Sequence, residues 1–281
     1  MAHELTFDPA SFKGVEYAGW QNGAASYDDL FGSVTRHVIE PLLDATDVRA
    51  DTRVLDVCCG LGYGAATALA RGARAIGIDF APAMVAQASE RYPAAVFRQG
   101  DAEALNFETG VFDAVICAFG VNHLQHPEKA IAEALRVLRP GGKYAFTMWC
   151  EPGRSKFHQL VLDSIRSYGT LDVPLPAAPP PFRFSDPEAC MMALLGAGFV
   201  SPHVIEVPLA FRPRTAEQVL DLTYSAVRLQ MILSRQTDEA RERIHRAIVE
   251  GVALFRVGGQ IELPMPAVLA SASSPSHALN A

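Results

Sequence analysis

The sequence has no long hydrophobic run, no cysteine framework and no excess of basic residues. Across its 281 residues, no apolar stretch approaches the roughly 20 residues that span a bilayer, so we expect no membrane span. The 24 Lys and Arg residues against 31 Asp and Glu residues give a net charge of −7. This balance disfavours a nucleic-acid partner and binding to an anionic membrane surface.

The five cysteines are spaced irregularly, so they predict neither disulfides nor a metal site. Cys58 and Cys59 are adjacent, Cys117 lies in a predicted strand and Cys190 in a predicted helix. A thiol site for a soft metal or arsenite is the alternative, but neighbouring side chains on extended backbone point to opposite sides. We therefore expect small, buried, apolar residues, which free cysteines usually are.

The sequence also lacks a basic stretch followed by an apolar one near its beginning, the pattern of a secretory signal. We therefore expect a cytoplasmic protein. Hydrophobic residues make up 49% of the sequence, which is enough to bury a substantial core. One large domain with a helical appendage is the organisation that we expect.

The most informative segment is VLDVCCGLGYG, residues 54–64. A short apolar run surrounds Asp56, a glycine-rich turn follows, and an alanine-rich helix comes next. Gly60, Gly62 and Gly64 lack a Cβ atom, so the backbone can turn with positive φ and lie close to a flat ligand. The pattern predicts a nucleotide-like ligand, although such a loop alone is a weak signal.

Acidic residues end the next two predicted strands. Asp79 follows the second strand, where a carboxylate suits hydrogen bonding to ribose hydroxyls. Asp101 follows the third, where it can accept a hydrogen bond from an exocyclic amine such as adenine N6. The chain continues with a fourth predicted strand at 114–119 and a helix at 127–138, which ends before an Arg-Pro-Gly-Gly turn. A fifth predicted strand follows at 143–148.

This succession resembles the class I S-adenosylmethionine-dependent methyltransferases, and especially the ubiquinone- and menaquinone-biosynthesis-type small-molecule methyltransferases. The resemblance covers roughly residues 27–149, and its motifs are residues 56–62, 77–79, 100–102, 112–113 and 133–142. Cys58 departs from the family pattern, since it stands where the family usually has the first glycine of the loop. The resemblance implies an α/β fold: a doubly wound, mostly parallel, seven-stranded Rossmann-like sheet with helices on both faces.

The resemblance also implies S-adenosyl-L-methionine as the cofactor and assigns residues to it. Asp56 is expected near the amino group, Asp79 on the ribose and Asp101 near the adenine. Phe80 and Met84 are placed to sandwich the adenine ring, with core packing as the alternative. The cofactor-binding candidates are Asp56, Cys58, Gly60, Gly62, Asp79, Phe80, Met84, Asp101, Ala102 and Phe119.

The acceptor is expected above the carboxyl ends of the strands. His123 is the candidate catalytic residue, because an imidazole can take up a proton near neutral pH; capping a turn or shaping the pocket is the alternative. Trp149 is a candidate aromatic wall for a planar acceptor. Tyr17, Trp20 and Gln21 are expected either to fold over the cofactor as a lid or to anchor the N-terminal segment.

Two further histidines, His37 and His158, lie on predicted helices, and we expect them at the surface or in the core rather than as bases. We divide the chain into an N-terminal lid segment (1–26), a cofactor-binding core (27–150), a C-terminal part of the sheet (151–270) with helical insertions at about 153–185 and 213–256, and a mobile tail (271–281).

The second insertion, at about 213–256, is also predicted to be helical. Residues 215–218 suggest a capping box, and an apolar stripe from Val219 to Leu233 predicts one continuous helix. The insertion is expected to form a lid over the substrate pocket or a homodimer contact, with packing against the domain as the alternative. Residues 260–266 predict the closing strand of the sheet.

The sequence thus predicts a methyltransferase that moves a methyl group by in-line displacement to an O, C or N atom of a small, apolar or aromatic metabolite. One alternative is a protein that keeps the fold without methylating, as a binding protein or a cofactor-assisted enzyme. A nicotinamide-dependent oxidoreductase is disfavoured because Gly60, Gly62 and Gly64 lack Gly-x-Gly-x-x-Gly spacing.

Overall fold

A seven-stranded sheet forms the centre of the computed structural model, which describes residues 5 and 7–276. The strand order is β3-β2-β1-β4-β5-β11-β6, and all neighbours run parallel except β11, which is antiparallel to β5 and β6. The predicted doubly wound, mostly parallel sheet is confirmed. Its strands are β1 (Arg53–Val57), β2 (Arg74–Asp79), β3 (Val96–Gln99), β4 (Phe112–Cys117), β5 (Leu138–Trp149), β6 (Val200–Val207) and β11 (Ala267–Ser273).

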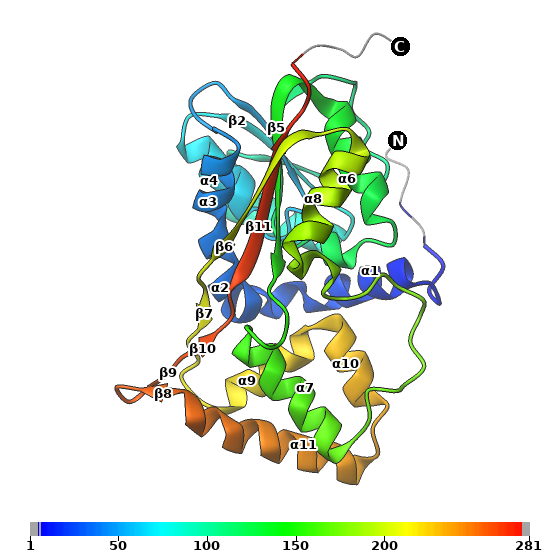
Figure 1. The fold of residues 1–281 in the computed structure, drawn as a ribbon, viewed down its shortest axis with the longest axis vertical. Helices are drawn as coiled ribbons and strands as arrows, with labels where there is room; N and C mark the ends of the chain where they lie inside the picture. Colours follow the sequence, from blue (N-terminus) through cyan, green and yellow to red (C-terminus); the bar gives the residue numbers. More distant parts are fainter. Residues whose placement is uncertain (1–4, 6, 277–281) are drawn as a thin grey trace.

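Helices cover both faces of this sheet, with α3 and α4 on one face and α6 and α8 on the other (Figure 1). The helices beside the sheet are α3 (Ile39–Ala45), α4 (Tyr63–Ala70), α5 (Pro82–Arg91), α6 (Pro127–Val137) and α8 (Pro187–Ala197). The short helix α2 (Ser33–Thr35) precedes α3 in the chain. The inner strands are apolar on both sides; β4, for example, buries four consecutive residues from Ala114 to Cys117. Such continuous apolar runs are typical of strands covered by helices on both faces.

A second helical layer lies beyond the carboxyl ends of the parallel strands. It comprises α7 (Lys156–Tyr168), α9 (Glu217–Ser225), α10 (Val227–Ser234) and α11 (Asp238–Gly251). The N-terminal helix α1 (Phe12–Gly23) runs between this layer and the sheet (Figure 1), in contact with both α5 and α10. No helix among the described residues is both long and apolar enough to cross a membrane.

Short elements connect these layers. The small sheets are β7 (Ala210–Phe211) with β10 (Leu263–Pro264), and β8 (Arg256–Val257) with β9 (Gln260–Ile261). Single turns of 3₁₀ or π helix complete the chain: η1 (Ala24–Ser26), η2 (Asp28–Gly32), η3 (Arg36–Val38), η4 (Val121–His123), η5 (Arg183–Ser185) and η6 (Val252–Phe255).

Local sequence signals explain where several helices begin. The Asp186 carboxylate accepts a hydrogen bond from the Glu188 amide, so α8 starts directly after this cap, and Gly198 at φ 100° ends it. The first helical insertion, expected at about 153–185, contains α7. Before α1 the Ser11 side chain accepts from the Gly14 amide, although the aromatic N-terminal segment has no helical period and predicted no helix.

The closing strand is a correction to the sequence prediction. Residues 260–266 contribute only two-residue strands, whereas β11 pairs with β5 along its whole length, Ala267 opposite Trp149 and Ser273 opposite Lys143. Ser274 is buried, and its amide donates to the Gly142 carbonyl at 2.8 Å. The prediction of a mobile tail from residue 271 is therefore wrong for residues 271–274, and residues 277–281 lie outside the described part.

The second insertion also differs from the prediction. The single helix from Val219 to Leu233 is divided at Ala226, whose extended backbone (φ −82°, ψ 108°) separates α9 from α10. The capping box does not form, because the Gln218 side chain accepts from the Arg214 amide rather than from residue 215. Both halves still bury the predicted stripe, because each helix packs on the rest of the protein.

Candidate functional site

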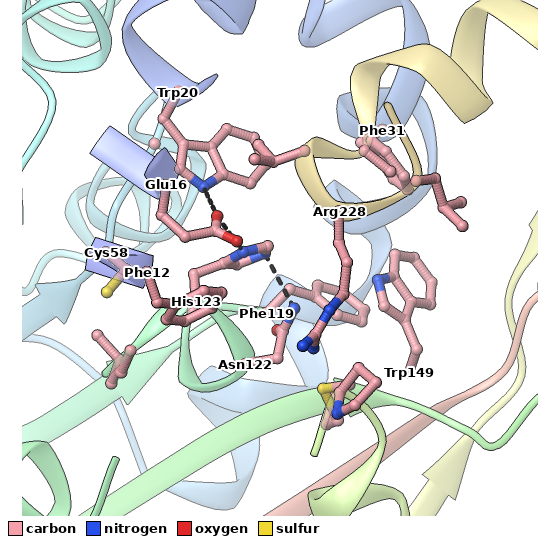
Figure 2. Close-up of a pocket in the computed structure, with 18 of the residues that line it drawn as sticks. Phe12, Glu16, Trp20, Phe31, Cys58, Phe119, Asn122, His123, Trp149 and Arg228 are labelled. Atoms are coloured by element: carbon pink, nitrogen blue, oxygen red, sulfur yellow. Dashed lines mark hydrogen bonds and ion pairs between the residues drawn. The ribbon is translucent and has the colours of Figure 1, made fainter. Parts of the chain in front are cut away.

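A cavity of about 490 Å³ lies between the carboxyl ends of the parallel strands and the second helical layer. Motif loops after β1, β2, β3 and β4 form its floor, and α1 and α10 cover it (Figure 2). This is the place where open α/β sheets bind their ligands. The predicted site residues that line the cavity are Trp20, Cys58, Gly60, Asp79, Phe80, Met84, Asp101, Ala102, Phe119, His123 and Trp149.

The glycine-rich loop leaves open space at the cavity floor. Gly60 and Gly62 have φ values of 51° and 85°, where a Cβ atom is disfavoured. A Cβ on Gly60 would meet no atom within 4 Å, whereas one on Gly62 would meet the Phe97 ring at 2.5 Å. Gly60 thus allows close approach of a ligand, and Gly62 allows close packing behind the loop and does not line the cavity.

Asp56 lies behind the loop rather than in the cavity lining. Its Oδ2 accepts a hydrogen bond from the Ala65 amide at 2.9 Å, at the start of α4. A Cβ on Gly64 would lie 2.5 Å from the same oxygen, which explains the third glycine. Burial raises the pKa of the Asp56 carboxyl to about 7. Asp56, which was expected near the cofactor amino group, is therefore separated from the cavity by the glycine-rich loop.

Asp79 is buried at the tip of β2 and faces the cavity. Its Oδ2 accepts from the Gly60 amide and its Oδ1 from the Ala81 amide, both at 2.9 Å. Burial raises the pKa of this carboxyl to about 6 despite these hydrogen bonds. Two amide donors fix the carboxylate, and each oxygen keeps a further lone pair for a ligand hydroxyl.

The next loop already holds a charge pair. The Lys13 ammonium of α1 lies 2.6 Å from Asp101 Oδ2 and 3.2 Å from Glu103 Oε2. The other Asp101 oxygen accepts from the Glu103 amide at 2.9 Å. Asp101 therefore lines the predicted adenine position with both oxygens engaged, so a ligand amine would share Oδ2 with Lys13.

Cys58 adopts the backbone that its glycine-like position requires, with φ of 56°. A Cβ on Gly120 would lie 2.6 Å from both the Cys117 sulfur and the Cys58 Cβ, so the two loops meet at this glycine. Hydrogen bonding to Cys117, together with burial, holds the pKa of the Cys58 thiol well above its ordinary value. The Cys58 thiol is therefore protonated at neutral pH and unlike a metal ligand.

The loop after β4 presents an aromatic wall. Phe119 has φ of 55°, and its amide donates to the Thr147 hydroxyl at 3.1 Å. Its ring stacks on Trp149 with centroids 4.0 Å apart. Phe31 adds a third ring, 6.1 Å from Trp149. The cavity thus has one flat, apolar side, and Trp149 is part of it.

A polar cluster faces this wall (Figure 2). Glu16 on α1 is only 2% exposed, and its Oε2 takes a hydrogen bond from Trp20 Nε1 at 3.0 Å. His123 Nδ1 lies 2.8 Å from the same oxygen, and the Asn122 amide nitrogen lies 3.0 Å from His123 Nε2. Among the described residues, Asn122 Oδ1 is the buried side-chain oxygen without a hydrogen-bond partner. The cluster therefore combines an oriented imidazole with an unsatisfied acceptor.

Two predicted lid residues anchor α1 instead of lining the cavity. The Tyr17 ring packs 5.8 Å from Phe80, and Gln21 Oε1 accepts from the Ala83 amide at 2.6 Å. Both contacts fix α1 to the beginning of α5. The alternative that the sequence left open, an anchoring role, fits Tyr17 and Gln21, whereas Trp20 lines the cavity.

Several lining residues were not predicted from the sequence, and three of them carry charged or titratable groups that matter below. Glu16 and Arg228 reach the cavity from α1 and α10, elements that the motifs do not include. His158 was expected on the surface or in the core; it is buried and lines the cavity, and burial lowers its pKa to about 3. A lone charged residue within the apolar run 227–233 was the available signal for Arg228. The described residues contain no group of His, Cys, Asp and Glu side chains suited to a metal ion.

Comparison with known proteins finds a family match for one part of the chain. Residues 55–146 match the family model described as "Methyltransferase domain". This part of the chain is similar to methyltransferase domains. The match covers the strands and loops from β1 to β5, which form the cavity floor, so the predicted resemblance is confirmed for these residues.

Individual relatives and solved structures agree with this match. The demethylmenaquinone methyltransferase of Beutenbergia cavernae is 36% identical over 118 residues, which are 42% of this chain and 49% of that protein. The chain thus spans about half the length of this curated relative. Two solved structures share the fold with a TM-score of 0.56: YcgJ of Bacillus subtilis (21% identical, 86% of this chain, 99% of that one) and a Haemonchus contortus phosphoethanolamine N-methyltransferase bound to S-adenosylhomocysteine (20% identical, 94% and 60%).

Proposed function

We propose that the protein transfers a methyl group from S-adenosylmethionine to a small, apolar or aromatic metabolite. The observation that carries this proposal is the combination of Gly60 and Asp79 at the floor of the cavity. Gly60 leaves open space above the loop, and the Asp79 carboxylate is fixed beside it by two backbone amides. The methyltransferase domain match and the solved complex of a structural neighbour with S-adenosylhomocysteine support the same cofactor.

The residues present fit an adenosyl group. Asp79 offers acceptors for two ribose hydroxyls, and Phe80 and Met84 line the adjoining wall with apolar surface. The Asp101 carboxylate lies where an exocyclic amine requires an acceptor, with Lys13 as its present partner. Gly60 provides the room that a flat ligand needs. These residues would hold the cofactor, and Asp56 would act from behind by fixing the loop.

The protein contributes to the reaction mainly by positioning the reactants. When bound, S-adenosylmethionine supplies a methyl group from a sulfonium, and its sulfur is left as a neutral thioether. The protein holds the acceptor against Phe119 and Trp149, and alignment of this kind supplies ~7–11 kcal/mol in favourable cases. Helices α1 and α10 cover the cavity and exclude water, so the N-terminal segment and part of the second insertion act as a lid.

His123 is placed to take a proton from the acceptor. With Asn122 donating to Nε2, the Nδ1 proton points to Glu16, and this fixes the neutral tautomer. An acceptor hydroxyl would replace Asn122 at Nε2 and transfer its proton there, while the Glu16 carboxylate stabilises the imidazolium. A homodimer through residues 213–256, the absence of a nucleic-acid partner and a cytoplasmic location stay predictions.

Calorimetric titration with S-adenosylmethionine, S-adenosylhomocysteine and NADH tests the cofactor. We expect micromolar binding of the two adenosyl compounds and none of NADH. Methyl transfer is then tested with isotopically labelled cofactor and a panel of phenolic and quinol acceptors. Absence of adenosyl binding would refute the proposal, and adenosyl binding without transfer to any acceptor would favour the non-methylating alternative.

A further inference from the structure

Arg228 brings a positive charge into a mostly apolar cavity. It lies on α10 between the buried residues Val227 and Leu229, and it lines the cavity with both of them. Figure 2 shows its guanidinium pointing into the cavity on the side of Asn122 and Phe119, opposite Glu16. A charged side chain in such surroundings requires a partner, because a buried unpaired charge is costly.

The other cations of the cavity have such partners. Lys13 pairs with Asp101 and Glu103, and Arg166 lies 2.8 Å from Asp163 Oδ1. Among the described residues, Arg228 is within ion-pair distance of no carboxylate. Among the same residues, the guanidinium makes one hydrogen bond, from Nη1 to the Pro179 carbonyl at a long 3.4 Å, and it lies 5.9 Å from the centre of the Phe12 ring.

The acidic groups of the cavity are committed elsewhere. Glu16 Oε2 binds Trp20 and His123, and Asp79 is held by backbone amides on the cavity floor. Burial lowers the pKa of Arg228, and attraction to the Glu16 carboxylate only partly offsets this. The guanidinium therefore keeps most of its hydrogen-bonding capacity directed at the cavity.

We infer that the acceptor carries an oxyanion, such as a carboxylate, which binds the Arg228 guanidinium while its apolar body lies against Phe119 and Trp149. This inference rests on the proposed function and narrows its substrate class. The guanidinium presents a planar fork of donors that matches an oxyanion.

A matched pair of fluorescent probes tests the inference without knowledge of the substrate. 8-Anilinonaphthalene-1-sulfonate has an aromatic body and an oxyanion, and N-phenyl-1-naphthylamine has the same body without the anion. Both probes are titrated into protein saturated with S-adenosylhomocysteine. We expect Arg228→Met to weaken binding of the sulfonate roughly ten- to hundred-fold, as expected for a charged hydrogen bond, and to leave the neutral probe within about two-fold.

Control variants locate the effect. Arg235→Met removes an exposed arginine just beyond the same helix and should change neither probe. Phe119→Ala removes part of the aromatic wall and should weaken both probes, which places them in the cavity. Arg228→Lys should recover part of the sulfonate affinity, because it restores the charge without the planar fork.

Three results would overturn the inference: no binding of the sulfonate to the wild-type protein, no effect of Arg228→Met on the sulfonate, or equal weakening of both probes. Methionine keeps a long apolar side chain, and thermal unfolding of each variant verifies that the fold is retained. Calorimetry with S-adenosylhomocysteine separates the two proposals. If the wild-type protein does not bind S-adenosylhomocysteine, the proposed function is contradicted. If it binds S-adenosylhomocysteine but gives one of the three probe results above, only the inference of an oxyanion on the acceptor is contradicted.

Discussion

His123 and Glu16 are joined by a hydrogen bond of 2.8 Å between Nδ1 and Oε2, although 107 positions separate them in the sequence. His123 belongs to the loop after β4, and Glu16 belongs to the helix that covers the cavity. The contact therefore connects α1 to the candidate base. The position of α1 over the cavity and the orientation of the imidazole depend on the same hydrogen bond.

Glu16→Gln should lower kcat about ten-fold at saturating cofactor. The glutamine keeps the size of the side chain but removes the charge that stabilises a protonated imidazole. Turnover is measured with the acceptor identified by screening, and cofactor affinity is measured by calorimetry. Because Glu16 acts through His123, the double variant with His123→Ala should be no slower than His123→Ala alone. Additive losses would show that Glu16 acts independently of His123.

Asp79→Ala should weaken S-adenosylhomocysteine binding roughly ten- to hundred-fold, the effect of losing a charged acceptor for two hydroxyls. Calorimetry measures the change, and Asp172→Ala, at an exposed loop residue, serves as the control that should bind normally. Unchanged affinity in Asp79→Ala would remove this residue from the ribose role.

The same carboxylate predicts the pH dependence of binding. Burial raises the pKa of Asp79 to about 6, and the ionised form is the better acceptor. Affinity for S-adenosylhomocysteine should therefore be full above pH 7 and should fall as the pH is lowered through about 6. Titrations between pH 5 and pH 8 measure this, and Asp79→Asn should bind weakly with little dependence on pH across the same range.

The residues proposed to hold the cofactor could be placed from the sequence, because each of them lies close to a strand end. Gly60, Asp79 and Asp101 lie at the end of a strand or within three residues after it, and parallel strands bring their carboxyl ends to one edge. Glu16 and Arg228, on the proposed acceptor side, could not be placed, because they come from helices whose position depends on tertiary packing. Sequence periodicity reports which side of a helix is apolar, and not which cavity that side covers.

The same distinction explains the errors in the fold. Residues 260–266 have stronger strand character than the sequence of β11, Ala-Val-Leu-Ala-Ser-Ala-Ser, but β11 is central because it completes hydrogen bonding between β5 and β6. The division between α9 and α10 at Ala226 has no breaking residue. Tertiary context overrode local propensity in both places.

Cys58→Gly should be more stable than Cys58→Ala. Both changes remove the thiol, but only glycine adopts the φ of 56° without steric cost, which is about 1–2 kcal/mol for other residues. Urea denaturation of the two variants measures the difference in the free energy of unfolding. Equal stability would mean that the loop around Cys58 relaxes when the side chain is changed. Alanine and glycine at exposed Ser26 provide a reference pair at a residue without positive φ.

His158→Gln should make the protein less sensitive to acid. Burial lowers the pKa of His158 to about 3, so the unfolded chain binds one more proton than the folded protein between pH 3 and 6.5. This proton destabilises the fold by about 1.4 kcal/mol per pH unit as the pH falls through that window. Glutamine does not titrate, so the dependence of the free energy of unfolding on pH should become less positive by this amount.

Asp56→Asn is the matched control, because its effect has the opposite sign. Burial raises the pKa of Asp56 to about 7, so the folded protein binds more protons than the unfolded chain between about pH 4 and 7. Its contribution to stability is present at low pH and is lost as the pH rises through 7. Asparagine removes this contribution and should make the acid sensitivity steeper. Urea denaturation at pH 5, 6 and 7 measures both slopes, and parallel changes in the two variants would contradict the assignment of either group.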